Sequence, residues 1–106
     1  MTTKKLQQFF EDNNFNVNLI KDGKIQCAEL ETWTGGGVNI VIYLNPFNVD
    51  SFKEYVNDFC IDDEIDFYRQ DKHYRNDFTI RQSVEDFESY LNDIKEVAEK
   101  LNTIKN

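Results

Sequence analysis

The sequence predicts an α+β domain, in which a three-stranded antiparallel meander carries helices packed on one face. In the N-terminal half, apolar residues alternate with polar ones between turn signals, which is the period of strands. In the C-terminal half, apolar residues recur at helical spacing. The length of 106 residues, with no linker or repeat, indicates one domain over residues 1–106. The expected element order is α-β-β-β-α-(α)-α.

Apolar spacing defines the first two elements. Residues 3–13 predict a helix that Thr2 or Thr3 can cap, with three apolar residues on one face: Leu6, Phe9 and Phe10. Residues 15–20, FNVNLI, alternate and predict a half-buried strand, with asparagines mostly on its other side.

Turn signals separate the other two strands. Asp22-Gly23 predicts a two-residue hairpin turn of type I′, which needs positive φ at both positions. The second strand is expected over residues 25–33, where the alternation is less regular and permits a bulge. The third is expected over residues 38–44, VNIVIYL, after a glycine-rich turn.

Two helices are expected after the sheet. The first opens at Asp50 or Ser51, with Glu54 completing a capping box, and has an apolar stripe: Phe52, Tyr55, Val56 and Phe59. The second is expected to begin at Ser83 as N-cap, with Asp86 three residues later as the other member of a capping box. Its apolar residues recur at helical spacing: Val84, Phe87, Leu91, Ile94, Val97, Ala98, Leu101 and Ile104.

Residues 61–80 fit either a short helix or a pinned loop. The helix is favoured by three apolar residues on one face: Ile61, Ile65 and Tyr68. The loop is favoured by aromatic side chains able to hold it against the core: Phe67, Tyr74 and Phe78.

Negative charge is concentrated in one segment. The net charge is −8, and residues 50–66 hold seven acids against one base, Lys53, a net of −6. This balance argues against direct binding to nucleic acid or to an anionic membrane, since both need a basic surface. It leaves a protein partner with a basic surface, and the residues expected to bind it are Asp50, Glu54, Asp58, Asp62, Asp63, Glu64 and Asp66.

The acidic run has two structural interpretations. On one continuous helix, Glu54, Asp58 and Asp62 would stack along an edge, and their repulsion would destabilise it. Alternatively, the helix stops near Cys60 and a new helix places the acids of 62–66 in its first turn, where the macrodipole favours them. The bases that follow could neutralise part of the surface: Arg69, Lys72 and Arg75.

No metal, cofactor or catalytic site is expected. Asp62, Glu64 and Asp66 imitate the start of a calcium loop, but Phe67 replaces its glycine and His73 its final glutamate. A Cys60–His73 pair would make a small enzyme, although a cysteine ending an apolar stripe is usually a core residue. Both Cys27 and Cys60 are expected to be buried, reduced thiols. Lacking a signal peptide or membrane span, the protein is expected to be cytoplasmic.

The segments EIDFYRQDKHYRNDFTI and SVEDFESYL resemble small proteins of unassigned activity from plasmids, conjugative transposons and prophages of low-GC Gram-positive bacteria. Separately, the expected element order and the acidity are similar to those of small anti-CRISPR proteins. Those proteins inhibit Cas9 by presenting carboxylates where the effector expects PAM-containing DNA. The resemblance implies a non-enzymatic interaction protein of a mobile genetic element, acting as a DNA mimic of the anti-CRISPR or anti-restriction type.

A structural or assembly module is the alternative hypothesis. It would form a homodimer through the aromatic segment 67–78 or an uncovered sheet face. The sequence is compatible with either a monomer or a homodimer. A dimer whose size is insensitive to salt would distinguish the module from the mimic.

Overall fold

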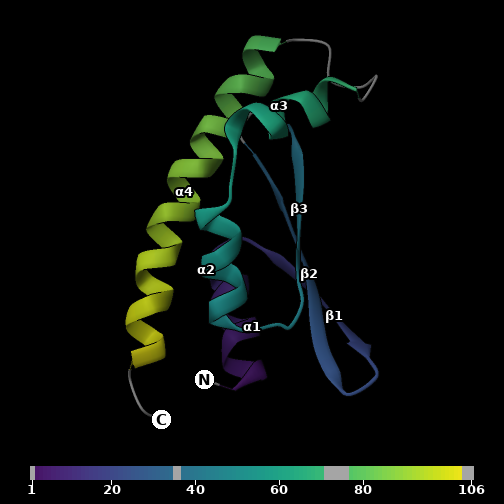
Figure 1. The fold of residues 1–106 in the computed structure, drawn as a ribbon. Helices are drawn as coiled ribbons and strands as arrows, with labels where there is room; N and C mark the ends of the chain where they lie inside the picture. The colour runs from purple at the N-terminus through teal and green to yellow at the C-terminus, as the bar shows by residue number, and fades with distance from the viewer. Residues whose placement is uncertain (1, 35–36, 71–76, 104–106) are drawn as a thin grey trace.

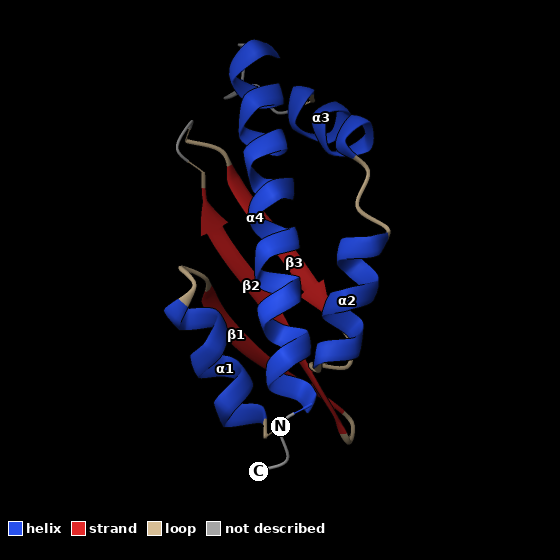
Figure 2. Cartoon of the chain, turned by 90° about the vertical axis from the view of Figure 1, so that its left-hand side faces the viewer, coloured by secondary structure: helices blue, strands red, loops and turns tan. Residues whose placement is uncertain are grey.

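The computed structural model describes residues 2–34, 37–70 and 77–103. Within these residues it contains a three-stranded antiparallel sheet and four helices, so the expected α+β fold and element order are confirmed, with a helix in the bracketed position. The elements are α1 Thr3–Asp12, β1 Asn16–Asp22, β2 Ile25–Trp33, β3 Asn39–Leu44, α2 Val49–Asn57, α3 Ile61–Arg69 and α4 Asp77–Thr103. Figure 1 shows the helices on one side of the sheet, and in Figure 2 they lie in front of it.

The sheet is a meander in the order β1-β2-β3. Pairing is continuous from Asn16↔Glu31 to Asp22↔Ile25, so the two residues of the hairpin loop are Gly23 and Lys24. Of these two loop residues, only Gly23 has positive φ, at 61°. The predicted hairpin is confirmed, but the type I′ prediction is wrong, since glycine at the first loop position alone is the pattern of type II′.

One face of the sheet is buried and the other is open. On β2 and β3 the residues that face the helices are buried: Ala28, Leu30, Thr32, Ile40, Ile42 and Leu44. The alternate residues face away from the helix layer, and several large apolar ones among them are half exposed: Ile25, Trp33, Val41 and Tyr43. Because a strand alternates its side chains, this open face follows from a helix layer on one side only.

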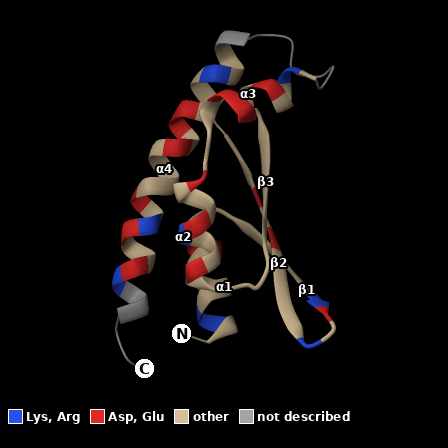
Figure 3. Ribbon diagram, in the orientation of Figure 1, with Lys and Arg blue, Asp and Glu red and all other residues tan. Residues whose placement is uncertain are grey.

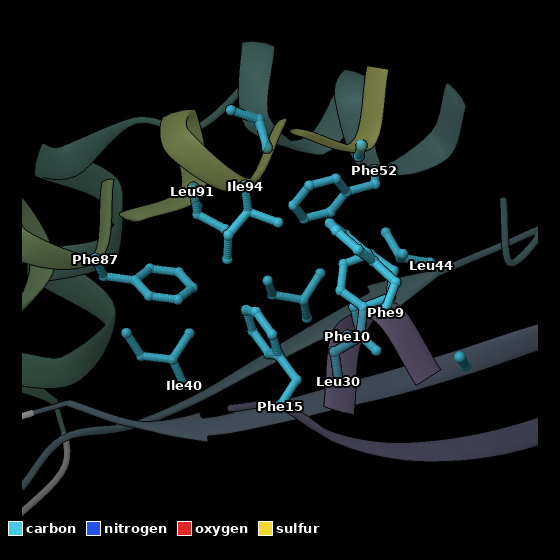
Figure 4. Close-up of a cluster of buried hydrophobic side chains, with 14 of the residues drawn as sticks. Phe9, Phe10, Phe15, Leu30, Ile40, Leu44, Phe52, Phe87, Leu91 and Ile94 are labelled. Carbon is cyan, nitrogen blue, oxygen red and sulfur yellow. The ribbon is translucent and has the colours of Figure 1, made fainter. Parts of the chain in front are cut away.

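The core forms where the helix layer meets the sheet. Phe10 is fully buried, and its ring centroid lies 4.9 Å from that of Phe52 and 5.7 Å from that of Phe15, both in edge-to-face contact. Figure 4 shows these rings converging with Leu91 and Ile94 of α4 over the strands. The core therefore joins α1, α2, α4 and the sheet.

Helix caps differ in part from the predictions. The Thr2 cap is confirmed, since its hydroxyl accepts from the backbone N–H of Lys5 at 3.2 Å. The predicted opening of α2 at Asp50 or Ser51 is wrong. Asn48 is the N-cap, and its side-chain oxygen accepts from the backbone N–H of Ser51 at 2.8 Å. Asn48 therefore takes the capping role that was expected of Ser51, at a position three residues earlier in the chain.

The last helix begins before its predicted cap. α4 starts at Asp77, so Ser83 and Asp86 lie inside it and do not form its capping box. Ile80 is buried one turn before Val84, so the apolar face of the helix extends N-terminal to Ser83. Val97, expected on that face, is 49 % exposed. Ile104 and the side chain of Leu101 lie outside the described residues.

The two cysteines have different environments. Cys27 is buried as expected, but Cys60 is exposed, and both are free thiols. The expectation for Cys60 is wrong because α2 ends at Asn57, which leaves Cys60 at the N-cap position of α3 and off any apolar stripe. Among the described helices, none is long and apolar enough to cross a bilayer.

Candidate functional site

The acidic residues expected to bind a partner lie on two helices separated by a short connection. On α2, Asp50 lies in the first turn, Glu54 is exposed and Asp58 is the C-cap. Its backbone N–H donates to the carbonyl oxygen of Glu54 at 3.0 Å, closing the last turn. Asp50 is therefore at the far end of α2 from Asp58, roughly 12 Å along the helix axis at 1.5 Å per residue.

The remaining four acids belong to α3. Asp62, Asp63 and Glu64 occupy its first turn, and Asp66 follows. The interpretation with two helices is thus confirmed, and the continuous ladder of Glu54, Asp58 and Asp62 does not form. Acids in a first turn interact favourably with the positive end of the helix dipole, so the sequence locally favours this helix start.

Two basic side chains on these helices pair with carboxylates. Arg69 Nη1 lies 3.1 Å from Asp66 Oδ1, while Lys53 Nζ lies 3.7 Å from Glu99 Oε1 of α4. Arg69 therefore neutralises part of the acidic surface, which is one of the possibilities considered from the sequence. Lys72 and Arg75, named with it, lie outside the described residues.

Glu64 differs from its acidic neighbours because it is half-buried. Burial raises the pKa of Glu64, and the charge of Asp63 raises it further. The pKa of Tyr55 is raised as well, first by burial and then by the charge of Glu64. Tyr55 of α2 and Glu64 of α3 therefore lie near each other, which ties the acidic start of α3 to the second half of α2.

We define the acidic helical surface as Asp58, Asp62, Asp63, Glu64 and Asp66, with Glu54 one turn before Asp58. Figure 3 shows acidic segments on α2, on the connection, at the start of α3 and along α4. The acids of α4 were not singled out from the sequence: Glu85, Glu88, Asp93, Glu96 and Glu99. The near balance of eight acids and seven bases over residues 67–106 concealed them. Packing of α4 against α2 and α3 places them in one helix layer with the predicted acids.

The short segment expected to be pinned by aromatic rings is only partly so. Ile65 and Tyr68 are buried and Ile61 packs against the core, as the helical interpretation predicts. Phe67 is 66 % exposed, so its predicted pinning role is wrong, because it lies on the opposite side of α3 from Ile65. Tyr74 and the side chain of Phe78 lie outside the described residues.

Within residues 2–34, 37–70 and 77–103, no group of three or more His, Cys, Asp or Glu side chains is arranged to hold a metal ion. Cys60 makes no side-chain capping bond to α3. His73, its hypothetical catalytic partner, lies outside the described residues.

The chain matches no protein-family model, no curated protein and no solved structure. The site has therefore to be interpreted from its own residues.

Proposed function

We propose that this protein is a non-enzymatic acidic interaction protein of a mobile genetic element, acting in the cytoplasm as a DNA mimic. Its partner would be a nuclease or another nucleic-acid-binding protein, which it occupies at the site meant for DNA. The anti-CRISPR and anti-restriction types of inhibitor both fit this description.

The observation that carries the proposal is the first turn of α3. Three consecutive acids lie there, beginning four residues after Asp58, and Asp62 and Asp63 are exposed. An exposed helix start fixes carboxylates on a rigid element, where they can contact Arg and Lys side chains that normally bind phosphates. Acids in the first turn stabilise a helix through its dipole. We assign partner binding to these acids as a second role.

Affinity capture from a bacterial lysate tests the proposal, run in parallel at about 0.1 M and about 0.5 M salt. We expect a DNA-binding protein to be retained at the lower salt and released at the higher. Duplex DNA carrying that protein's binding site should then displace it from the column. A partner that binds this protein and DNA simultaneously would contradict the mimic.

Neutral variants test the surface itself. The triple variant Asp62→Asn, Asp63→Asn, Glu64→Gln should lose binding to the captured partner while it remains folded by circular dichroism. A matched control removes two Asp charges and one Glu charge elsewhere: Asp12→Asn, Asp22→Asn and Glu11→Gln, all exposed. If both variants weaken binding equally, net charge and not this surface carries the interaction.

A second candidate function, a homodimeric assembly module, is favoured by the open sheet face. Trp33 is 61 % exposed, and Val41 and Tyr43 are each 51 % exposed. Neighbouring large apolar side chains in water are typical of an interface. Analytical ultracentrifugation at both salt concentrations distinguishes the candidates, because an apolar dimer persists at high salt. Val41→Lys should then dissociate it.

A further inference from the structure

A cavity of about 190 Å³ opens between α4, the end of β2 and the turn after α1. Residues distant in sequence line it, including Asn14, Thr32, Trp33, Ser83 and Asp86. Among the described residues that line it, Trp33 is the one that also belongs to the open sheet face, and none belongs to the acidic helical surface. In Figure 2, α1 and the end of β2 lie on one side of α4, whereas α2 and α3 lie on the other.

Two of the hydroxyl groups that line the cavity already donate their hydrogens to backbone carbonyls. Thr32 donates to the carbonyl oxygen of Asn14 at 2.9 Å, and the Tyr90 hydroxyl donates to the carbonyl oxygen of Asn13. Each hydroxyl has one hydrogen, so these two oxygens can offer only lone pairs to a ligand. Both bonds also fix the turn after α1, where Asn14 has a φ of 69°.

The other polar lining residues carry a carboxylate (Asp86), two hydroxyls (Ser83 and Thr34), the amide of Asn14 and the indole N–H of Trp33. Asp86 is exposed at the cavity and forms no ion pair among the described residues. Ser83 is 4 % exposed and contributes a hydroxyl to the cavity lining. Thr34 accepts from the backbone N–H of Val38 at 3.0 Å and keeps its own hydrogen.

The cavity therefore offers more acceptors than donors, together with one negative charge. No Lys, Arg or His among the described residues lines it. An anion would meet the Asp86 carboxylate without a positive charge to offset it. A cation with several N–H donors would satisfy the Asp86 carboxylate and the free lone pairs of Thr32 and Tyr90. Phe87 and Trp33 add apolar lining that an alkyl stem can contact.

We infer that this cavity is a binding site for an alkyl guanidinium or ammonium group, with Asp86 as the ion-pair partner and Ser83 as a buried hydrogen-bonding group. The cation comes either from an Arg or Lys side chain of a protein or from a free small molecule. The inference is independent of the proposed function, since none of the residues of the acidic helical surface lines the cavity.

Titration of the full-length protein with n-butylguanidinium tests the site by amide and indole NMR shifts. Trp33 is the only tryptophan and lines the cavity, so its indole signal reports binding directly. The uncharged analogue n-butylurea keeps the shape and removes the charge. We expect a saturable shift with the guanidinium and none with the urea. Asp86→Asn should weaken binding about tenfold or more, as for loss of one charge-assisted hydrogen bond.

Asp93→Asn is the matched control, since Asp93 is an exposed carboxylate of the same helix outside the cavity lining. It should leave the affinity unchanged, whereas Ser83→Ala should weaken it. Equal binding of urea and guanidinium, full affinity in Asp86→Asn, or no saturable shift would each overturn the inference. A tripeptide, acetyl-Gly-Arg-Gly-amide, that binds more tightly than n-butylguanidinium supports a protein side chain as ligand. The opposite order supports a free cation.

Discussion

Arg69 and Asp66 form an ion pair one turn apart on α3, with Nη1 and Oδ1 at 3.1 Å. Both side chains remain substantially exposed, at 42 % and 66 %. The pair thus removes one carboxylate from the acidic helical surface but leaves the three acids of the first turn of α3 unopposed by Arg69. If the surface mimics DNA, Arg69 weakens the mimicry.

Arg69→Gln should therefore tighten binding to a basic partner. Its effect on stability should be small, about 0.2–0.5 kcal/mol, since exposed pairs at this spacing contribute little. Binding to the captured partner at about 0.1 M salt and urea unfolding measure the two quantities. Arg69→Lys keeps the charge and serves as control. Weaker binding of Arg69→Gln would mean that Arg69 itself contacts the partner.

Glu64→Gln should stabilise the protein at neutral pH. Burial and the charge of Asp63 raise the pKa of Glu64 above its ordinary 4.5, so the folded protein holds the proton more tightly than the unfolded chain. The contribution of Glu64 to the free energy of unfolding is then largest below the unfolded pKa and falls as pH rises through the folded one. First-turn acids interact favourably with the helix dipole, but a raised pKa means that burial outweighs this effect.

Urea unfolding of wild type and Glu64→Gln across pH 3 to pH 7 measures this difference. The advantage of the variant should be present at neutral pH and disappear in acid, where Glu64 is protonated in both states. Asp62→Asn, one residue from Asp63 but exposed, is the control and should not show the same stabilisation. A variant less stable than wild type at pH 7 would contradict the prediction.

Asn48→Ala should destabilise the protein by about 1 kcal/mol, because it removes the side-chain acceptor for the first turn of α2. Asn48→Asp keeps an acceptor and should be close to wild type. Ser51→Ala tests the cap expected from the sequence, and we expect no loss of stability, since Ser51 contributes only its backbone N–H. Chemical unfolding of the three variants decides between Asn48 and Ser51.

Phe10→Ala should destabilise the protein by about 3–5 kcal/mol, the usual cost of removing a buried phenylalanine ring. For a small domain with a total stability of about 5–15 kcal/mol, this loss leaves little margin. Phe67→Ala removes the same ring from an exposed position and should change stability by less than about 0.5 kcal/mol. Thermal unfolding of both variants, followed by circular dichroism, compares them.

Local signals in the sequence were sufficient for most of the fold. The bounds of β2 and the meander order were predicted correctly, and Thr2 is one of the two caps expected for α1. Each depends on neighbours within a few residues: alternation along a strand, a glycine in a hairpin, a hydroxyl three residues before the amide that it caps. The acidic first turn of α3 is local in the same way, which is why one of the two interpretations identified it.

The tertiary structure decided everything that depends on contacts between distant segments. α4 begins at Asp77, before Ser83, and packing buries Ile80 on this first part of the helix. The end of α2 at Asn57 leaves Cys60 exposed. The alternation of β3 predicts two faces, but only the one-sided helix layer leaves Val41 and Tyr43 in solvent. Ser83 and Asp86 were expected as a capping box. They became part of a cavity because α4 packs beside the end of β2, and no periodicity in sequence encodes that distance.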